Sequence, residues 1–465
     1  MTSIAGTSHD LFSSRVYLPI SRLQRLMHPS RRAVMKACRA GMRFRRDAAQ
    51  WSFDRRREWI LGRLRFAVRR AYSETSYYRG LFDRIGFDPA ADFSFEEFAR
   101  LPVLDREDVA SAGRGLVSNV VPPEQLQKDS TGGSTGKPTE VWIGPEEKGW
   151  RESAIETFMQ RIGAPAGTRV AFFWGHHLDP VKSDNLRDRW YSFATNVRWF
   201  DCFRLSPDVL DLCHDGLRRW SPACIVAYAS ALGQLAERLL ERGDMAPYPS
   251  RCLVTGGEKL LFHHRQAIET SFGRPVHERY GGRDVGPIGL QMEPARALDY
   301  EIDWSNVLVE PETTEPDSPI LITKLHADGM PMLRYRVGDL GRFPNGSKPG
   351  QPAFKLHEVL GREADRIWLP DGRWIHGIQM PHMMKDYPIK EFRLTQRPDY
   401  SVQLKIIPKD SFQRDECQAI RSTIAANLPG LELTIEIVDE IPRTRANKQR
   451  PVVSEVEPIT TRLAS

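Results

Sequence analysis

Apolar runs and helical repeats alternate through the middle of the chain. Three runs of mostly apolar residues, at positions 170–174, 224–228 and 252–255, predict buried strands. Apolar residues spaced three and four apart predict helices at 207–219 and 230–242, one on each side of the second strand. Strands that alternate with helices at this spacing indicate α/β units around a largely parallel sheet.

Glycines stand close behind the predicted strands. Gly175 follows the first strand directly, Gly256-Gly257 follows the third, and Gly281-Gly282 lies farther along the chain, where a further loop of this kind would lie. Ligands of parallel sheets bind beyond the carboxyl ends of the strands. We therefore expect a ligand site at the edge where these glycines gather.

The part of the chain before the sheet carries a helical pattern. From Trp51 onward, one face of a predicted helix is apolar, and its members are Ile60, Leu64, Ala67, Val68 and Ala71. Ser94 and Glu97 have the spacing of a capping box, which predicts a helix that starts there and ends near Leu101-Pro102. Residues 1–30 carry no such pattern, and we expect them to be loosely structured.

The last hundred residues change character. Short strands are predicted at 392–394, 402–407 and 433–438, with one helix at 414–427, which is typical of a small α+β domain. We place the junction near 361–365, after a Gly/Pro-rich stretch. The predicted organisation is a basic arm at 1–50, a large α/β domain with mixed, largely parallel sheets at 51–361, and a small domain at 362–465.

Composition and charge narrow the class of protein. The 465 residues are 40% hydrophobic and 27% charged, and no apolar run approaches the ~18 residues of a membrane span. There is no secretory apolar core near the N-terminus, and the six cysteines form no CxxC pair, so we expect a cytoplasmic protein without integral membrane association. Cys202, Cys213 and His214 are the nearest to a metal cluster, but their spacing fits no common zinc pattern.

The positive charge is concentrated at the beginning of the chain. Residues 1–72 hold 17 Lys/Arg against 4 Asp/Glu, a net charge of +13, whereas the whole chain carries +6. Such a segment can bind nucleic acid or an anionic membrane surface. A solvated helical face, or docking onto the acidic remainder, is the simpler interpretation. Because the segment has Trp51 and Phe53 but no interleaved aromatic pattern suited to base stacking, we expect no nucleic-acid partner.

A loop rich in glycine and hydroxyl groups is the strongest chemical signal. Its glycines let backbone amides approach phosphate oxygens, four hydroxyls add donors, and a lysine adds charge. The loop runs through Ser130, Thr131, Gly132, Gly133, Ser134, Thr135, Gly136, Lys137, Pro138 and Thr139. It lacks the Walker spacing, and a proline stands where a magnesium-binding Ser or Thr would follow the lysine.

Four later segments carry further candidates, each with an ordinary alternative. In Tyr280-Gly281-Gly282-Arg283-Asp284 the carboxylate could bind Mg²⁺ and the ring could stack on a purine, although such a turn is common. Asp339 could accept ribose hydroxyls, and Arg362 could donate to ribose or phosphate or form a surface salt bridge. Lys448, in a basic stretch near the C-terminus, could bridge a carboxylate and a phosphate or simply be solvated.

These segments, in this order, resemble the adenylate-forming superfamily of acyl-CoA ligases, luciferases and peptide-synthetase adenylation domains. The match runs from about Arg55 to Lys448 and is best for the branch of phenylacetate-CoA ligase, coenzyme F390 synthetase and the capsule protein CapK. The segments that match this branch best are residues 69–79, 101–104, 254–258 and 330–339.

The resemblance implies an ATP-dependent ligase that uses Mg²⁺ to adenylate a small carboxylic acid. The activated acyl group is then transferred to an acceptor. The resemblance also implies that the loop holds the ATP phosphates, that Gly257 and Glu258 line the adenine and acyl pocket, and that Tyr280 and Gly281 lie beside the adenine. Asp284 takes the magnesium position, Asp339 and Arg362 bind the ribose, and Lys448 is the adenylation lysine on a mobile C-terminal domain. Coenzyme A is the branch's usual acceptor, and an amine acceptor giving an amide is the alternative.

Several departures from the family pattern leave the substrate open. Asp284 replaces the usual glutamate, Arg283 replaces a Ser or Thr, and Ala364 replaces the hinge Asp or Lys. His176, His177 and Arg283 could face the acyl pocket, and an Arg283 side chain in that place would suit an acid with a second anion. A degenerate, non-catalytic scaffold is the alternative of another class, and a nucleic-acid binder rests on residues 1–72 alone. The oligomeric state is left open.

Overall fold

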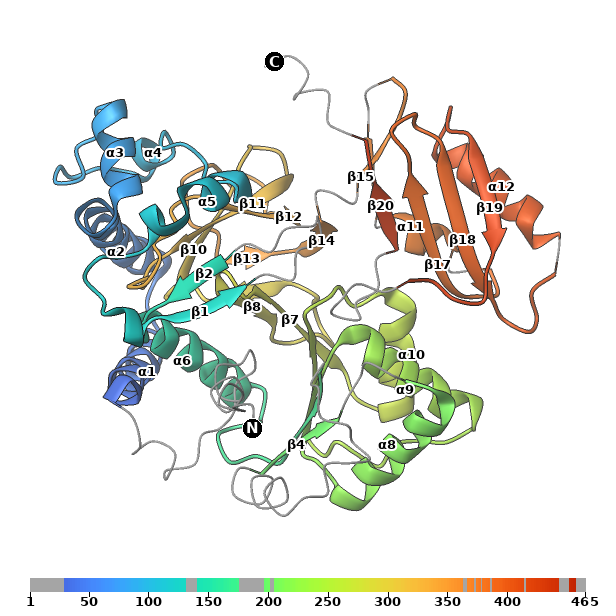
Figure 1. The fold of residues 1–465 in the computed structure, drawn as a ribbon. Coiled ribbons are helices and arrows are strands. Elements are labelled where there is room, and N and C mark those ends of the chain that lie inside the picture. Colours follow the sequence, from blue (N-terminus) through green and yellow to red (C-terminus); the bar gives the residue numbers. More distant parts are fainter. Residues whose placement is uncertain are drawn as a thin grey trace, which may run out of the picture.

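The computed structural model describes residues 29–130, 140–174, 196–200, 205–362, 366–371, 374–377, 379–384, 387–413, 415–442 and 451–456. Figure 1 shows a large body of sheets and helices, with the strands of the C-terminal segment in a layer of their own. Within the described residues, no helix is long and apolar enough to cross a membrane.

Helices make up the first part of the body. They are α1 (Pro29–Asp47), α2 (Phe53–Glu74), α3 (Ser76–Ile85), α4 (Phe95–Phe98) and α5 (Arg106–Ala112), followed by the 3-10 turns η2 (Gly113–Leu116) and η3 (Pro123–Gln125). The apolar face predicted for α2 is buried in full. The Ser94–Glu97 capping box is present, but α4 is only one turn long and ends at Phe98.

An eight-stranded sheet forms the centre of the molecule, in the order β13-β9-β8-β7-β6-β5-β3-β4. The five strands from β7 to β4 are parallel, and the other three pair antiparallel. Their bounds are β3 (Val170–Phe173), β4 (Val197–Phe200), β5 (Cys224–Ala227), β6 (Cys252–Gly256), β7 (Val276–Gly282), β8 (Gly286–Gln291), β9 (Tyr300–Ile302) and β13 (Lys355–Leu356).

Helices cover both faces of this sheet because successive strand residues point to opposite sides. On one face, Ala171 and Phe173 of β3 pack with the apolar sides of α8 (Pro207–Trp220), α9 (Ala229–Glu241) and α10 (Phe262–Phe272). On the other, Val170 and Phe172 pack with α6 (Pro145–Arg161). The α/β prediction is therefore confirmed, with mixed and largely parallel strands.

Two antiparallel sheets complete the body. The hairpin of β1 (Gln127–Ser130) and β2 (Glu140–Ile143) carries the glycine-rich loop between its strands. A four-stranded sheet has the order β10-β11-β12-β14. Its strands are β10 (Val307–Pro311), β11 (Asp317–Lys324), β12 (Tyr335–Arg342) and β14 (Glu358–Arg362). Apolar residues of α2 and α3 share one core with this sheet.

The C-terminal segment has a core of its own, whose buried members all lie between Ile367 and Val452. Its sheet has the order β19-β18-β17-β20, and a small hairpin pairs β15 with β16. The elements are β15 (Arg366–Trp368), β16 (Trp374–His376), α11 (Gln379–Met384), β17 (Ile389–Gln396), β18 (Val402–Pro408), α12 (Glu416–Asn427), β19 (Leu433–Ile437) and β20 (Val452–Ser454).

Helix α1 is the main departure from the predicted elements. It packs along α6 so closely that a Cβ at Gly149 would lie 2.5 Å from the Cβ of Ala37. Arg45 anchors its end through an ion pair with Asp303 of 2.6 Å, in which both side chains are almost fully buried. The basic segment is therefore docked on one side, while Arg32, Lys36, Arg39 and Arg43 remain exposed on another.

Candidate active site

The strand pairing of the β1–β2 hairpin positions both ends of the glycine-rich loop. Ser130 ends β1 and lies opposite Glu140 of β2. The carbonyl oxygen of Ser130 accepts a hydrogen bond of 3.1 Å from Nη1 of Arg283. The remaining predicted loop residues lie outside the described residues, and these are Thr131, Gly132, Gly133, Ser134, Thr135, Gly136 and Lys137. The base of the loop is thus joined to the end of β7.

Three predicted nucleotide-binding residues meet beside this point. The hydroxyl of Tyr280, on β7, donates to Oδ2 of Asp339 over 2.9 Å. Nε of Arg362, at the end of β14, lies 3.1 Å from Oδ1 of the same carboxylate. Burial, and then the charge of Asp339, raise the pKa of the Tyr280 phenol, so the phenol stays protonated and donates. Asp339 is partly exposed, so its carboxylate remains open to a further donor.

Asp284 is held rigidly on the loop that follows β7. Its Oδ2 accepts from the hydroxyl of Tyr335 at 3.1 Å, and its Oδ1 accepts from the amide of Val285 at 3.1 Å. Arg151 donates to the backbone carbonyls of both Arg283 and Asp284, which fixes this turn against α6. A single carboxylate in a protein site suits Mg²⁺, since this ion keeps several waters and binds substrate phosphates. The carboxylate oxygens of Asp284 are of the ligand type that Mg²⁺ takes.

Gly257 and Glu258 leave the end of β6. Gly257 has a φ of +82°, and a Cβ there would lie 2.6 Å from the ring of Tyr228, so only glycine fits. Oε1 of Glu258 accepts from the amide and the hydroxyl of Ser230, at 2.7 and 2.5 Å, at the beginning of α9. The Glu258 carboxylate therefore helps to hold the start of this helix.

An aromatic and cationic group stands beside Gly257, and the sequence reading did not find it. The rings of Trp174 and Tyr228 stack at 4.1 Å between centroids, with 21° between their planes. The guanidinium carbon of Arg279 lies 5.7 Å from the centre of the Trp174 ring. Trp174 directly follows β3 and Tyr228 directly follows β5, whereas Arg279 lies within β7, so the signal available in the sequence was the position of the two aromatic residues at strand ends.

Comparisons with known proteins show which sequences and which fold this chain resembles. The phenylacetate-coenzyme A ligase of Pseudomonas putida is 23% identical over 333 residues, covering 68% of this chain and 72% of that protein. The phenylacetate-coenzyme A ligase of Escherichia coli K12 is 24% identical, covering 66% and 70%. A solved 2-hydroxyisobutyryl-CoA ligase in the postadenylation state covers 88% of this chain and 91% of its own, with a TM-score of 0.67 at 19% identity. No family model matches the chain.

The predicted resemblance to the adenylate-forming superfamily and its phenylacetate-coenzyme A ligase branch is confirmed: the chain is similar in sequence to phenylacetate-coenzyme A ligases and similar in fold to a solved CoA ligase. The assignment of individual site residues stays a prediction.

Two of the segments that match this superfamily branch pack together as framework. Leu104 forms a bridge with Tyr335, and the amide of Arg336 donates to the carbonyl of Leu104 over 2.9 Å. The hydroxyl of Tyr78 accepts from the amide of Leu333 at 2.9 Å. These contacts hold the strand that carries Asp339.

Several predicted residues of the superfamily pattern fall outside the described part of the chain. Lys448 and Ala364 are among them, as are His176 and His177. Arg283 is described, and its contact with Ser130 places it at the base of the loop. The adenylation lysine and the hinge therefore stay predictions from the resemblance.

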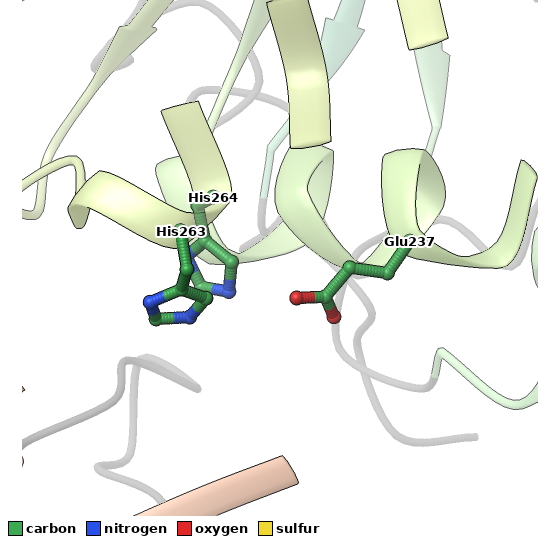
Figure 2. Close-up of side chains that lie close together, drawn as sticks. All are labelled: Glu237, His263 and His264. Atoms are coloured by element: carbon green, nitrogen blue, oxygen red, sulfur yellow. The ribbon is translucent and has the colours of Figure 1, made fainter. Parts of the chain in front are cut away.

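One metal-capable cluster lies apart from this site, on α9 and α10. The ligand atoms of Glu237, His263 and His264 lie within 4.8 Å of one another, and Figure 2 shows the carboxylate of Glu237 facing the two rings. Burial lowers the pKa of His263, and nearby Lys409 adds to this shift. A cation so close opposes binding of a second one. In the weaker candidate, Nδ1 of His214 contacts the hydroxyl of Tyr248 at 2.7 Å, and Cys202 lies outside the described residues.

Proposed function

We propose that this protein activates a small carboxylic acid with ATP, forming an acyl-adenylate and pyrophosphate. The observation that carries the proposal is the meeting of Tyr280, Asp339 and Arg362, from three separate strands. Arg283, three residues after Tyr280, contacts Ser130 at the base of the glycine-rich loop. Sequence similarity to phenylacetate-coenzyme A ligases supports the same reaction class.

Each residue has a physical task in this reaction. The exposed part of the Asp339 carboxylate accepts hydrogen bonds from the ribose hydroxyls, while Tyr280 and Arg362 hold that carboxylate in place. The amides and hydroxyls of the loop bind the phosphates. Asp284 would hold Mg²⁺, which neutralises phosphate charge when bound. Lys448 brings a positive charge to the acid and the α-phosphate as the two anions approach.

The second step transfers the acyl group, and we propose coenzyme A as the acceptor. The curated relatives are named as coenzyme A ligases, and one solved neighbour is a 2-hydroxyisobutyryl-CoA ligase with its acyl-adenylate and CoA in the thioesterification state. An amine acceptor remains the second candidate, and the product distinguishes them. A thioester has a new C–S bond, and an amide has a new C–N bond.

The experiment is hydroxylamine trapping with ATP, Mg²⁺ and a panel of aryl and aliphatic acids. Asp339→Asn keeps the shape of the side chain but removes its charge, so we expect the KM for ATP to rise about 10-fold or more through loss of a charge-assisted hydrogen bond. Asp317→Asn is the matched control, because Asp317 also pairs with an arginine (Arg342, 2.8 Å) in the same sheet, but it is the exposed first residue of β11. Hydroxamate formation by none of the acids would favour the scaffold alternative.

A further inference from the structure

Arg279 occupies an unusual place at the ligand edge of the central sheet. It is the residue before Tyr280 on β7, so its side chain leaves the opposite side of the strand. Tyr280 turns toward Asp339, and Arg279 turns toward Trp174, whose ring centre is 5.7 Å from the guanidinium carbon. A Cβ at Gly256 would lie 3.5 Å from Nε of Arg279, so the cation lies against the backbone of β6.

The charge of Arg279 has no ion-pair partner in the part of the chain that the structure describes. Two other inward-facing arginines do have ion-pair partners. Arg45 pairs with Asp303 at 2.6 Å, and Arg334 pairs with Glu310 at 3.2 Å. Burial lowers the pKa of Arg279, with the nearby Tyr228 phenol acting in the other direction, yet a guanidinium stays charged at neutral pH. A half-buried cation without a counter-charge is costly unless a ligand supplies one.

The surroundings of Arg279 define what such a ligand must look like. Trp174 and Tyr228 present stacked rings next to the cation, and these favour a planar or apolar body. A guanidinium binds carboxylate, phosphate or sulfonate oxygens with two parallel donors. Arg283, the other cation of this region, already donates to the carbonyl of Ser130 at the loop. Arg279 is therefore the better placed of the two to meet the acid.

We propose that the acid activated by this protein carries a second anionic group, and that Arg279 binds that group while Trp174 and Tyr228 line the body of the molecule. The inference rests on the proposed function, since it assigns the substrate class of the same site. The reacting carboxylate points toward the phosphates, and the second anion points away from them, toward the carboxyl ends of β3 and β5.

Matched acids that differ only in the second anion test the proposal. The probes are phenylacetate with 4-carboxyphenylacetate, and butyrate with succinate, in the hydroxylamine-trapping assay with the full chain. We expect kcat/KM to be higher for the dianionic member of at least one pair. Arg279→Gln should lower kcat/KM for that acid by about 10²-fold and change the monoanionic acid by less than about 3-fold, because a site built around a polar contact discriminates by such factors.

Arg251→Gln is the matched control. Arg251 directly precedes β6, at the amino end of the same sheet, and its side chain is exposed and donates to the carbonyl of Gly163. This variant should keep the wild-type preference. A thermal-shift measurement adds a readout that needs no turnover: the preferred dianionic acid should raise the Tm of the wild type and of Arg251→Gln, and should not raise that of Arg279→Gln.

The outcomes separate this inference from the proposed function. Activation of monoanionic acids alone, or an equal loss for both acids in Arg279→Gln, would overturn the second-anion assignment and leave the ligase reaction standing. If no acid forms a hydroxamate and none shifts the Tm, the ligase proposal fails, and this inference fails with it.

Discussion

Single residues in this protein combine structural and chemical duties, and His326 shows how burial sets a charge state. Its ring stacks on Trp150 with 3.6 Å between centroids. Its Nδ1 lies 2.9 Å from Nη2 of Arg63, and its Nε2 lies 3.0 Å from the carbonyl of Ser305. Because Arg63 can only donate, Nδ1 must accept, and the ring is neutral with its proton on Nε2. Burial lowers the pKa of His326 to about 4.

This neutral histidine predicts a loss of stability in acid. The unfolded chain takes up the proton near pH 6.5 and the folded chain only near pH 4. The contribution is therefore present above pH 6.5 and disappears as the pH falls toward 4, and a shift of this size corresponds to about 3 kcal/mol. Urea unfolding between pH 7.5 and 4.5 should show this fall in the wild type and a flatter profile in His326→Gln.

Comparing the pH dependence of unfolding in the wild type and in His326→Gln gives the contribution of this histidine. Asp328, whose pKa burial raises to about 6, acts in the opposite direction and is common to both. His357→Gln is the control, since His357 is exposed and contacts Asp299 at the surface. The His357→Gln variant should keep the wild-type slope of the free energy of unfolding against pH. An identical slope in His326→Gln would mean that this ring does not govern the acid response.

At the residue scale, the sequence predicted some contacts and missed others for a physical reason. Tyr280 and Asp339 each belong to a segment with a recognisable pattern, and their order along the chain suggested a shared site that the structure brings together. Trp174 and Tyr228 stand singly after separate strands, Arg279 lies within a third, and only the arrangement of those strands makes the three residues neighbours. A group assembled by strand register leaves no local signal in the sequence.

At the scale of elements, the apolar patterns of the central sheet and its helices were informative, whereas the pattern of one helix in the basic segment was overlooked. The strands at 170–174 and 224–228 and the helix at 230–242 are present with nearly the expected bounds. Helix α1 was not predicted, because the sequence interpretation took residues 1–50 only as a basic arm. The helix is nevertheless strongly amphipathic, and Phe44 packs on Trp150 of α6, so a helical pattern was present in the sequence.

The packing of α1 on α6 predicts a strong effect of one methyl group. In Gly149→Ala the new Cβ would meet Ala37, so the helices must separate and the variant should lose about 1–3 kcal/mol of stability through overpacking. The measurement is the free energy of unfolding in urea. Gly62→Ala, in the middle of α2 with nothing within 4 Å of its new Cβ, should be neutral or stabilised by up to about 1 kcal/mol. Equal effects of the two changes would contradict tight α1–α6 packing.

At the scale of the whole molecule, the proposed reaction depends on Asp339 and Arg362 of the body and on Lys448 of the C-terminal segment. Asp339 and Arg362 stand on β12 and β14 of the body, and Arg362 directly precedes the segment that leads to β15. Burial in separate cores lets the C-terminal segment hold its own structure. Sequence patterns predicted the existence of this α+β segment, but not the strand order β19-β18-β17-β20, because register and pairing depend on contacts between distant residues.

This arrangement predicts that nucleotide binding and adenylation can be separated by one change in the C-terminal segment. Lys448→Ala leaves Tyr280, Asp339 and Arg362 intact, so ATP should still bind. Adenylation should fall by about 10²-fold or more, because one electrostatic donor to the reacting groups is lost. Pyrophosphate release measures the reaction, and binding of a fluorescent ATP analogue measures the nucleotide site.

Lys405→Ala is the control, since Lys405 pairs with Glu436 within the C-terminal sheet, and this variant should remain active. Pyrophosphate release at the wild-type rate by Lys448→Ala would remove this lysine from the reaction, and loss of ATP binding in the same variant would place it in the nucleotide site instead.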